Sequence, residues 1–131
     1  MKVVADTNTF LAVALDEPEK RELLQATEGV ALAAPAVLPY EIGNALSALV
    51  KRKRLDVDEA RNAWRIIQRI PVELMEMDVP AALGIAAEQG IYAYDAYFLQ
   101  CAMSLRCPLL TLDRAMMRVA RAMSIQLVEK P

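Results

Sequence analysis

The chain contains no histidine, and this absence excludes several kinds of chemistry. Without an imidazole there is no Ser-His-Asp triad, no Cys-His dyad, no histidine-ligated zinc and no histidine acid/base pair that would let an RNA 2′-hydroxyl attack its neighbour. Any general base must be a carboxylate, a lysine or a metal-activated water. Cys101 and Cys107 are the only cysteines. Two thiols alone make no zinc site, and we expect them to be reduced and buried.

Long apolar runs are also missing, although 56% of the 131 residues are hydrophobic. No segment is long enough to span a membrane, and the chain meets Asp6 too early for a signal peptide, so we expect a cytoplasmic protein. Aromatic residues make up only 5%, which indicates an aliphatic core. The net charge of -2 and the pI of about 5.2 argue against strong, indiscriminate binding of nucleic acid.

Short apolar strands alternate with helical segments along the whole chain. We expect strands at 2–6, 30–34, 72–77, 108–112 and 125–128, and helices at 9–15, 18–27, 39–53, 58–69, 80–90, 94–106 and 114–123. This alternation predicts one α/β domain over residues 1–131, a three-layer α/β/α structure with a parallel sheet. Because the third and fifth strands carry polar residues and the others do not, the predicted five-stranded order is 3-2-1-4-5.

Asp6 stands at the carboxyl end of the predicted central strand, in Val3-Val4-Ala5-Asp6-Thr7. Ligands of open α/β sheets bind beyond such strand ends, so this acid is well placed for a site. An Asp at this position also caps helices, and that alternative stays open.

Asp113 repeats the pattern after the fourth strand, in Thr111-Leu112-Asp113. Thr111 lies two residues earlier, so its hydroxyl points to the same side as Asp113 if the strand geometry continues.

Two further acids lie on helices that start near the same edge of the sheet. Glu41 falls at the margin of the apolar stripe of its helix, where the helix dipole alone would also favour it. Asp95 opens a helix that is apolar nearly all round and has no basic residue one turn away. Such a carboxylate is expected to be buried, and it needs either backbone amides at a helix cap or a cation brought by the fold.

These four acids are expected around one crevice, where they repel one another. A divalent cation with oxygen ligands, Mg²⁺ or Mn²⁺, would hold them ionised. Such an ion also lowers the pKa of a bound water and stabilises the oxygens of a phosphodiester, which makes the absence of histidine understandable.

The motifs Val4-Ala5-Asp6-Thr7-Asn8, Glu41, Tyr94-Asp95-Ala96-Tyr97 and Thr111-Leu112-Asp113-Arg114 resemble the PIN domain in order and spacing, over the whole chain. A free-standing domain of this size is similar to VapC-type toxins of toxin-antitoxin pairs. The resemblance implies a Mg²⁺- or Mn²⁺-dependent endoribonuclease, often a homodimer, whose partners are its RNA substrate and a small antitoxin that covers the acidic pocket. The family's acidic ligands, which act in metal binding and catalysis, fall on Asp6, Glu41, Asp95 and Asp113, and its supporting polar positions on Thr7, Asn8 and Thr111.

The densest basic run is Lys51, Arg52, Lys53 and Arg54, which we take as candidate RNA-binding residues. A solvated cationic helix end explains the same run. Two other functions stay open. One is a PIN fold that has lost catalysis and binds a partner; the other is a haloacid-dehalogenase-like phosphatase, which needs a second Asp where this chain has Asn8.

Overall fold

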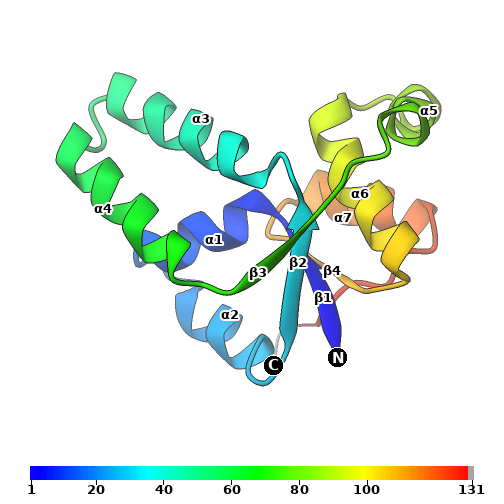
Figure 1. Cartoon of the computed structure of the whole chain (residues 1–131), viewed down its shortest axis with the longest axis horizontal. Coiled ribbons are helices and arrows are strands. Elements are labelled where there is room, and N and C mark those ends of the chain that lie inside the picture. The colour runs from blue at the N-terminus through cyan, green and yellow to red at the C-terminus, as the bar shows by residue number, and fades with distance from the viewer. Residues whose placement is uncertain (130–131) are drawn as a thin grey trace.

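A parallel sheet forms the centre of the computed structural model, which describes residues 1–129 (Figure 1). Its four strands are β1 (Lys2–Ala5), β2 (Ala31–Pro35), β3 (Val72–Met75) and β4 (Leu109–Leu110), in the order β3-β2-β1-β4. Val3, Val4 and Ala5 of β1 are at most 2% exposed. A strand buried on both faces reads as an unbroken apolar run, and the prediction that the first strand is central is confirmed.

Helices cover both faces of the sheet. One layer holds α1 (Thr7–Ala14), α2 (Lys20–Ala26), α3 (Leu38–Lys51) and α4 (Val57–Gln68), and the other holds α5 (Val79–Gln89), α6 (Ala93–Leu105) and α7 (Arg114–Ala122) (Figure 1). This arrangement follows from right-handed crossovers. The chain moves from β1 to β2 to β3 in one direction and then returns across the sheet to β4. The three-layer α/β/α prediction is confirmed.

The predicted fifth strand is wrong for the part of the chain that the structure describes. Residues 125–128 meet β4 only through one isolated bridge, between Leu109 and Leu127. Toward the start of β4 the ladder ends because the Cys107 N–H, which would be its next donor, is already bonded to the Ala102 carbonyl at the end of α6. The sheet therefore has the order 3-2-1-4, with an irregular segment at its β4 edge.

Local sequence signals account for most helix ends. Asp56 and Glu59 form a capping box at the start of α4, in which each side chain accepts a hydrogen bond from the other residue's backbone N–H. Gly90 ends α5 with a φ of 67°, a left-handed conformation that glycine adopts without strain. Asp6 and Asp113 begin α1 and α7.

The buried side chains form one continuous core between the two helical layers and the sheet, with Phe98, Leu99 and Leu109 among its largest members. Both cysteines are free thiols; Cys101 is buried and Cys107 half-buried. Among the helices of residues 1–129, none combines the length and apolar character that crossing a membrane requires.

Candidate functional site

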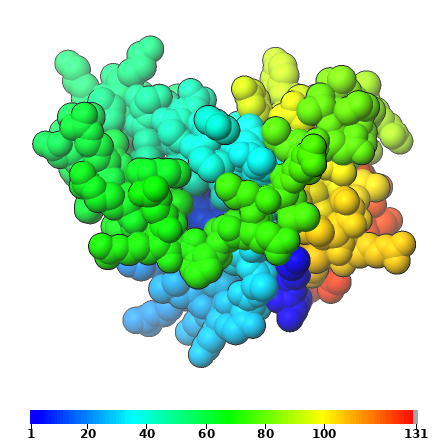
Figure 2. All heavy atoms as spheres, viewed as in Figure 1, coloured from blue at the N-terminus to red at the C-terminus, as the bar shows by residue number. Residues whose placement is uncertain are grey.

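Asp6 and Asp113 lie at the carboxyl ends of neighbouring parallel strands. Asp6 follows β1 and Asp113 follows β4 after a short loop. From β1 the chain continues into one helical layer, and from β4 into the other. Such a divergence opens a crevice beyond the strand ends. Figure 2 shows the surface notched between the α3 side and the α5–α6 side, at the end toward which the strands point in Figure 1.

The Asp6 carboxylate is only 6% exposed and is held at both oxygens. Oδ1 accepts a hydrogen bond of 2.8 Å from the backbone N–H of Thr7, so Asp6 does cap α1. Oδ2 accepts from Thr111 Oγ1 over 2.8 Å and from Asn8 Nδ2 over 3.4 Å. A cap uses one carboxylate oxygen, and here the second is fixed by a side chain from another part of the sheet. Asp6 therefore caps α1 with one oxygen, and its role as a site residue stays a prediction.

Thr111 and Asn8 join the two strand ends to each other. The Thr111 hydroxyl donates to Asp6 and accepts from the Asp113 backbone N–H over 3.1 Å. The Asn8 side chain donates to Asp6, and its Oδ1 accepts from the Leu112 backbone N–H over 3.1 Å. Buried, mutually satisfied hydrogen bonds of this kind fix side-chain positions. Thr111 and Asn8 thus orient the acids, as polar residues around an ion site do.

Glu41 and Asp95 occupy the first turns of α3 and α6. Glu41 is half-buried, whereas Asp95 is exposed. The expectation of a buried Asp95 is wrong because the first turn of α6 faces solvent at the crevice; its neighbour Tyr94 is 57% exposed as well. Asp95 does not cap α6 either, since the N-cap is Tyr92 and makes no side-chain cap hydrogen bond. An exposed carboxylate needs neither a cap nor a cation, so the metal-binding role of Asp95 stays a prediction.

The four carboxylates interact electrostatically. Burial, and to a smaller degree the charges of Asp95 and Asp113, raises the pKa of Asp6 from 3.8 to about 6, although its hydrogen bonds act in the opposite direction. Burial and the charge of Asp95 raise the pKa of Glu41. Asp95 is exposed overall, yet its carboxyl is partly desolvated where it faces the crevice, and this desolvation together with the charge of Asp113 raises its pKa. Like charges that raise each other's pKa lie close together without a compensating cation. The structure therefore brings all four predicted acids around one crevice.

Among residues 1–129, no lysine or arginine forms an ion pair with these four acids. The ion pairs found there are Lys2–Glu73, Lys20–Asp16 and Arg61–Asp58. Thr7 contributes a buried hydroxyl that is also unsatisfied within the described chain. Its buried Oγ1 has no hydrogen-bond partner among the described residues, although its side chain lies against Glu41 and lowers the pKa of that carboxyl. A cation with its water shell would satisfy both.

The residues fit a divalent ion that keeps several bound waters better than one ligated by protein side chains alone. Within the described chain, no three acidic, cysteine or histidine side chains converge closely enough to ligate one ion together. Mg²⁺ commonly keeps several waters and binds through one or two carboxylates, and oxygen ligands suit both Mg²⁺ and Mn²⁺. Asp6 with one neighbouring acid could hold such an ion directly, and the remaining acids through water.

The predicted RNA-binding run lies away from the acids. Lys51 ends α3, and Arg52, Lys53 and Arg54 follow it, all exposed. Lys51 stands about 15 Å along the helix axis from Glu41, at 1.5 Å per residue. The structure does not bring these four residues to the crevice, and their role stays a prediction.

Sequence reasoning missed Thr9. Its hydroxyl, 5% exposed, donates to the backbone carbonyl of Asp6 over 2.6 Å and so fixes the turn from β1 into α1. The signal was present, because Thr9 is the third residue after a helix-capping Asp, within reach of the cap's own backbone.

The three-layer fold and the acids at a topological switch point define a class: parallel α/β domains with an acidic crevice beyond the strand ends. Within that class, the sequence model described as the PIN domain matches residues 3–122. The chain belongs to the PIN domain family.

Relatives with curated names are similar over most of their length. The chain is 28% identical over 119 residues to Ribonuclease VapC3 of Pyrobaculum aerophilum, covering 87% of this chain and 91% of the relative. It is 28% identical over 111 residues to Ribonuclease VapC9 of Mycobacterium tuberculosis, covering 85% of each.

Two solved structures share the fold. PAE2754 from Pyrobaculum aerophilum superimposes with a TM-score of 0.70 at 24% identity, over 91% of this chain and 79% of that one. VapBC2 from Rickettsia felis, bound to a DNA fragment from its promoter, superimposes with a TM-score of 0.69 at 14% identity, over 97% of both chains. At these identities the likeness concerns the fold.

Proposed function

We propose that the protein is a Mg²⁺- or Mn²⁺-dependent endoribonuclease, the toxin of a type II toxin-antitoxin pair that acts in the cytoplasm. The names of its relatives support the ribonuclease and toxin assignments. The observation that carries the proposal is the buried Asp6 carboxylate at the strand end, which interacts with two further acids and pairs with no cation of residues 1–129.

The residues around the scissile phosphodiester have different roles. Asp6, Asp95 and Asp113 bind the ion, directly or through water, and Glu41 completes its shell or orients the attacking water. Thr111 and Asn8 keep Asp6 in position through their hydrogen bonds. The bound ion supplies positive charge that lowers the pKa of water and stabilises the phosphate oxygens. Glu41, whose pKa is raised, is suited to accept a proton at its carboxylate when water attacks.

A small antitoxin is the proposed protein partner, and a homodimer the proposed assembly. Solved toxin-antitoxin complexes among the structural neighbours support the first. An acidic crevice without its own cation favours a partner that brings positive charge to it.

Cleavage of a mixed cellular RNA pool by antitoxin-free protein tests the function, with Mg²⁺ or Mn²⁺ against EDTA. Three proteins are compared at matched purity: the parent, Asp6→Asn, and Glu88→Gln as a control that neutralises an exposed acid of α5. We expect the parent and Glu88→Gln to cut at discrete sites only with metal, and Asp6→Asn to lose at least about 10³-fold in rate. If Asp6→Asn cuts as fast as the parent, the metal-site proposal is wrong.

A catalytically inactive, partner-binding PIN fold is the alternative that the same experiment addresses. It would be supported if neither RNA cleavage nor ion binding in calorimetry were seen. The phosphatase alternative has no observation in its favour. Asn8 stands where such a phosphatase needs its second Asp. Its hydrogen bonds require an amide, because Nδ2 donates to Asp6 and Oδ1 accepts from the Leu112 backbone N–H.

A further inference from the structure

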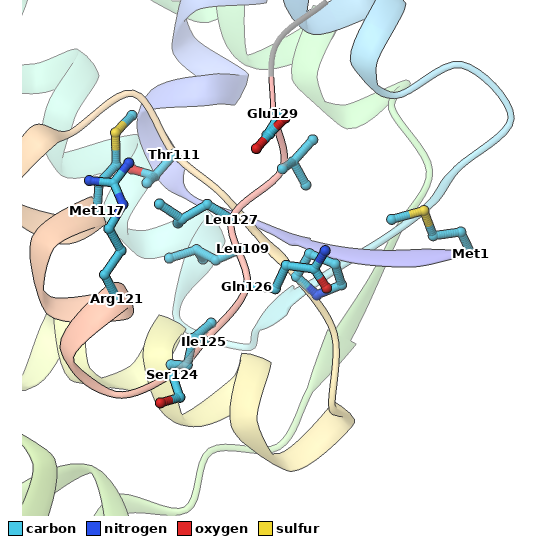
Figure 3. A pocket seen from close by; sticks show the side chains of 12 residues that line it. Met1, Leu109, Thr111, Met117, Arg121, Ser124, Ile125, Gln126, Leu127 and Glu129 are labelled. Carbon is cyan, nitrogen blue, oxygen red and sulfur yellow. The ribbon is translucent and has the colours of Figure 1, made fainter.

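A second hollow lies on the far side of β4 from β1, between α7 and residues 124–129 (Figure 3). Its volume is about 1120 Å³, and we call it the β4 groove, lined chiefly by Leu109, Thr111, Met117, Arg121, Leu127 and Glu129. Thr111 belongs to both the groove and the acidic crevice, since its hydroxyl bonds Asp6. The groove therefore leads up to the candidate site.

One wall of the β4 groove carries Arg121, which belongs to a basic face of α7. Helix α7 contains three exposed arginines and no acid. At 100° per residue, Arg114, Arg118 and Arg121 lie within about 60° of one another around the helix, on one face. Arg121 points into the groove beside Met117, as Figure 3 shows. None of the three forms an ion pair within the described part of the chain.

This arginine face begins at the site itself. Arg114 directly follows Asp113, and Arg121 stands about 11 Å further along the helix axis. The basic run at the end of α3 begins about 15 Å from Glu41 and is separated from the acids by the length of that helix. In a chain of net charge -2, unpaired cations next to an acidic crevice suit a polyanion that must reach the crevice.

The floor of the groove adds a second kind of contact. Met117, Leu127 and Val128, which stay partly exposed, give it apolar side chains near the guanidinium of Arg121. A single RNA strand presents both chemistries at once, phosphates along its backbone and unstacked bases beside them. An acidic protein partner would be attracted by the arginines, but its charge would not account for the apolar side chains of the groove.

We propose that the β4 groove and the arginine face of α7 bind the single-stranded RNA that flanks the scissile bond, with arginines on its phosphates. The proposal rests on the ribonuclease function proposed above and names where its substrate lies. For single strands each lost phosphate contact changes the salt exponent by about 0.7, which is about fivefold in affinity near 0.1 M salt. Loss of all three arginines is then about 100-fold, with a salt slope lower by about 2.

The test separates binding from cleavage. Binding of a fluorescent, mixed-sequence single-stranded RNA is titrated at several salt concentrations in the Asp6→Asn background, and cleavage of the RNA pool is followed in the parent background. The test variant carries Arg114→Gln, Arg118→Gln and Arg121→Gln. The matched control removes the same charge from α4, as Arg61→Gln, Arg65→Gln and Arg69→Gln, all exposed positions. Thermal melts verify that each variant folds.

We expect the α7 variant to bind about 100-fold more weakly and to cleave correspondingly slowly, while the α4 control stays within about fivefold of the parent. Arg121→Lys should retain most of the affinity, because a point charge still attracts phosphate. Glu129→Gln, which removes the acid of the groove, should strengthen binding by a few-fold.

Several results would overturn the proposal. Equal losses in the α7 and α4 variants would mean that only total charge matters. An α7 variant that binds and cleaves RNA as the parent does, but no longer binds its antitoxin, would make the arginine face a protein-binding surface. Equally tight binding of a duplex of the same sequence would refute the single-strand assignment. If the parent cuts no RNA yet binds it through α7, the groove survives and the nuclease function fails.

Discussion

The buried charge of Asp6 lowers the free energy of unfolding of the metal-free protein, so replacing Asp6 with Asn should stabilise the fold at neutral pH. The pKa of this carboxyl rises from 3.8 to about 6, chiefly through burial. A shift of this size corresponds to about 3 kcal/mol lost from the free energy of unfolding once the group is ionised. Asn has nearly the same shape and no charge. It forgoes the hydrogen bond donated by Thr111, about 1 kcal/mol, so the net gain is about 2 kcal/mol.

The sign of the pH dependence follows from the raised pKa. Folded protein holds the Asp6 proton more tightly than the unfolded chain does, so the uncharged carboxyl contributes stability that is fully present below about pH 4. That contribution is lost as the pH rises to about 6. The free energy of unfolding of Asp6→Asn minus that of the parent should therefore rise by about 3 kcal/mol from pH 4 to pH 8.

Urea unfolding of both proteins in EDTA, at steps between pH 4 and pH 8, measures this difference directly. Subtracting the parent's curve removes the titration of the other carboxyls that the two proteins share. Glu88→Gln serves as the control, and its difference from the parent should stay flat. A difference for Asp6→Asn that varied by less than about 0.5 kcal/mol over the whole range would refute the buried, cation-free carboxylate.

Three further predictions follow from the site and the core. Mg²⁺ at about 100 times its Kd should raise the parent's free energy of unfolding by about 2.7 kcal/mol, and that of Asp6→Asn much less, in parallel urea titrations. Thr111→Val should cost about 1–3 kcal/mol in unfolding experiments and slow RNA cleavage, since it removes one hydrogen bond from the buried Asp6 carboxylate and leaves the Asp113 N–H without its partner. Phe98→Ala, at a side chain 1% exposed, should cost about 3–5 kcal/mol and lower the melting temperature while leaving Mg²⁺ affinity intact, and an unchanged melting temperature would contradict the core assignment.

The parts of the structure that short-range rules determine were predictable from sequence. An apolar run that ends at an acid located both β1 with Asp6 and the Thr111–Asp113 stretch, because strand burial and helix capping each depend on a few neighbouring residues. Parallel order then placed the two strand ends together. Helical periodicity pointed to Glu41 and the lack of a basic partner to Asp95, the resemblance to the PIN domain then gave both a metal-binding role, and the structure brings them to the same crevice.

The features that could not be predicted from sequence depend on competition between groups that are distant in the chain. Residues 125–128 alternate as a strand should, yet within the described chain they meet β4 only at the Leu109–Leu127 bridge, because the Cys107 N–H before it is bonded to the end of α6. The exposure of Asp95 depends on how far α6 extends beyond the sheet, and helical periodicity carries no information on that. The β4 groove likewise exists only because the last segment leaves the sheet edge.

The hydrogen bond that Thr111 donates to Asp6 connects residues 105 positions apart in the sequence. During synthesis on the ribosome, a nascent chain that has not yet reached Thr111 contains Asp6 but not the hydroxyl that orients its carboxylate from the β4 side. Local helices form in microseconds, whereas contacts between distant segments wait for the intervening chain. The acidic crevice is therefore among the last features to be assembled, and a growing polypeptide carries no complete site before Thr111 and Asp113 have been made.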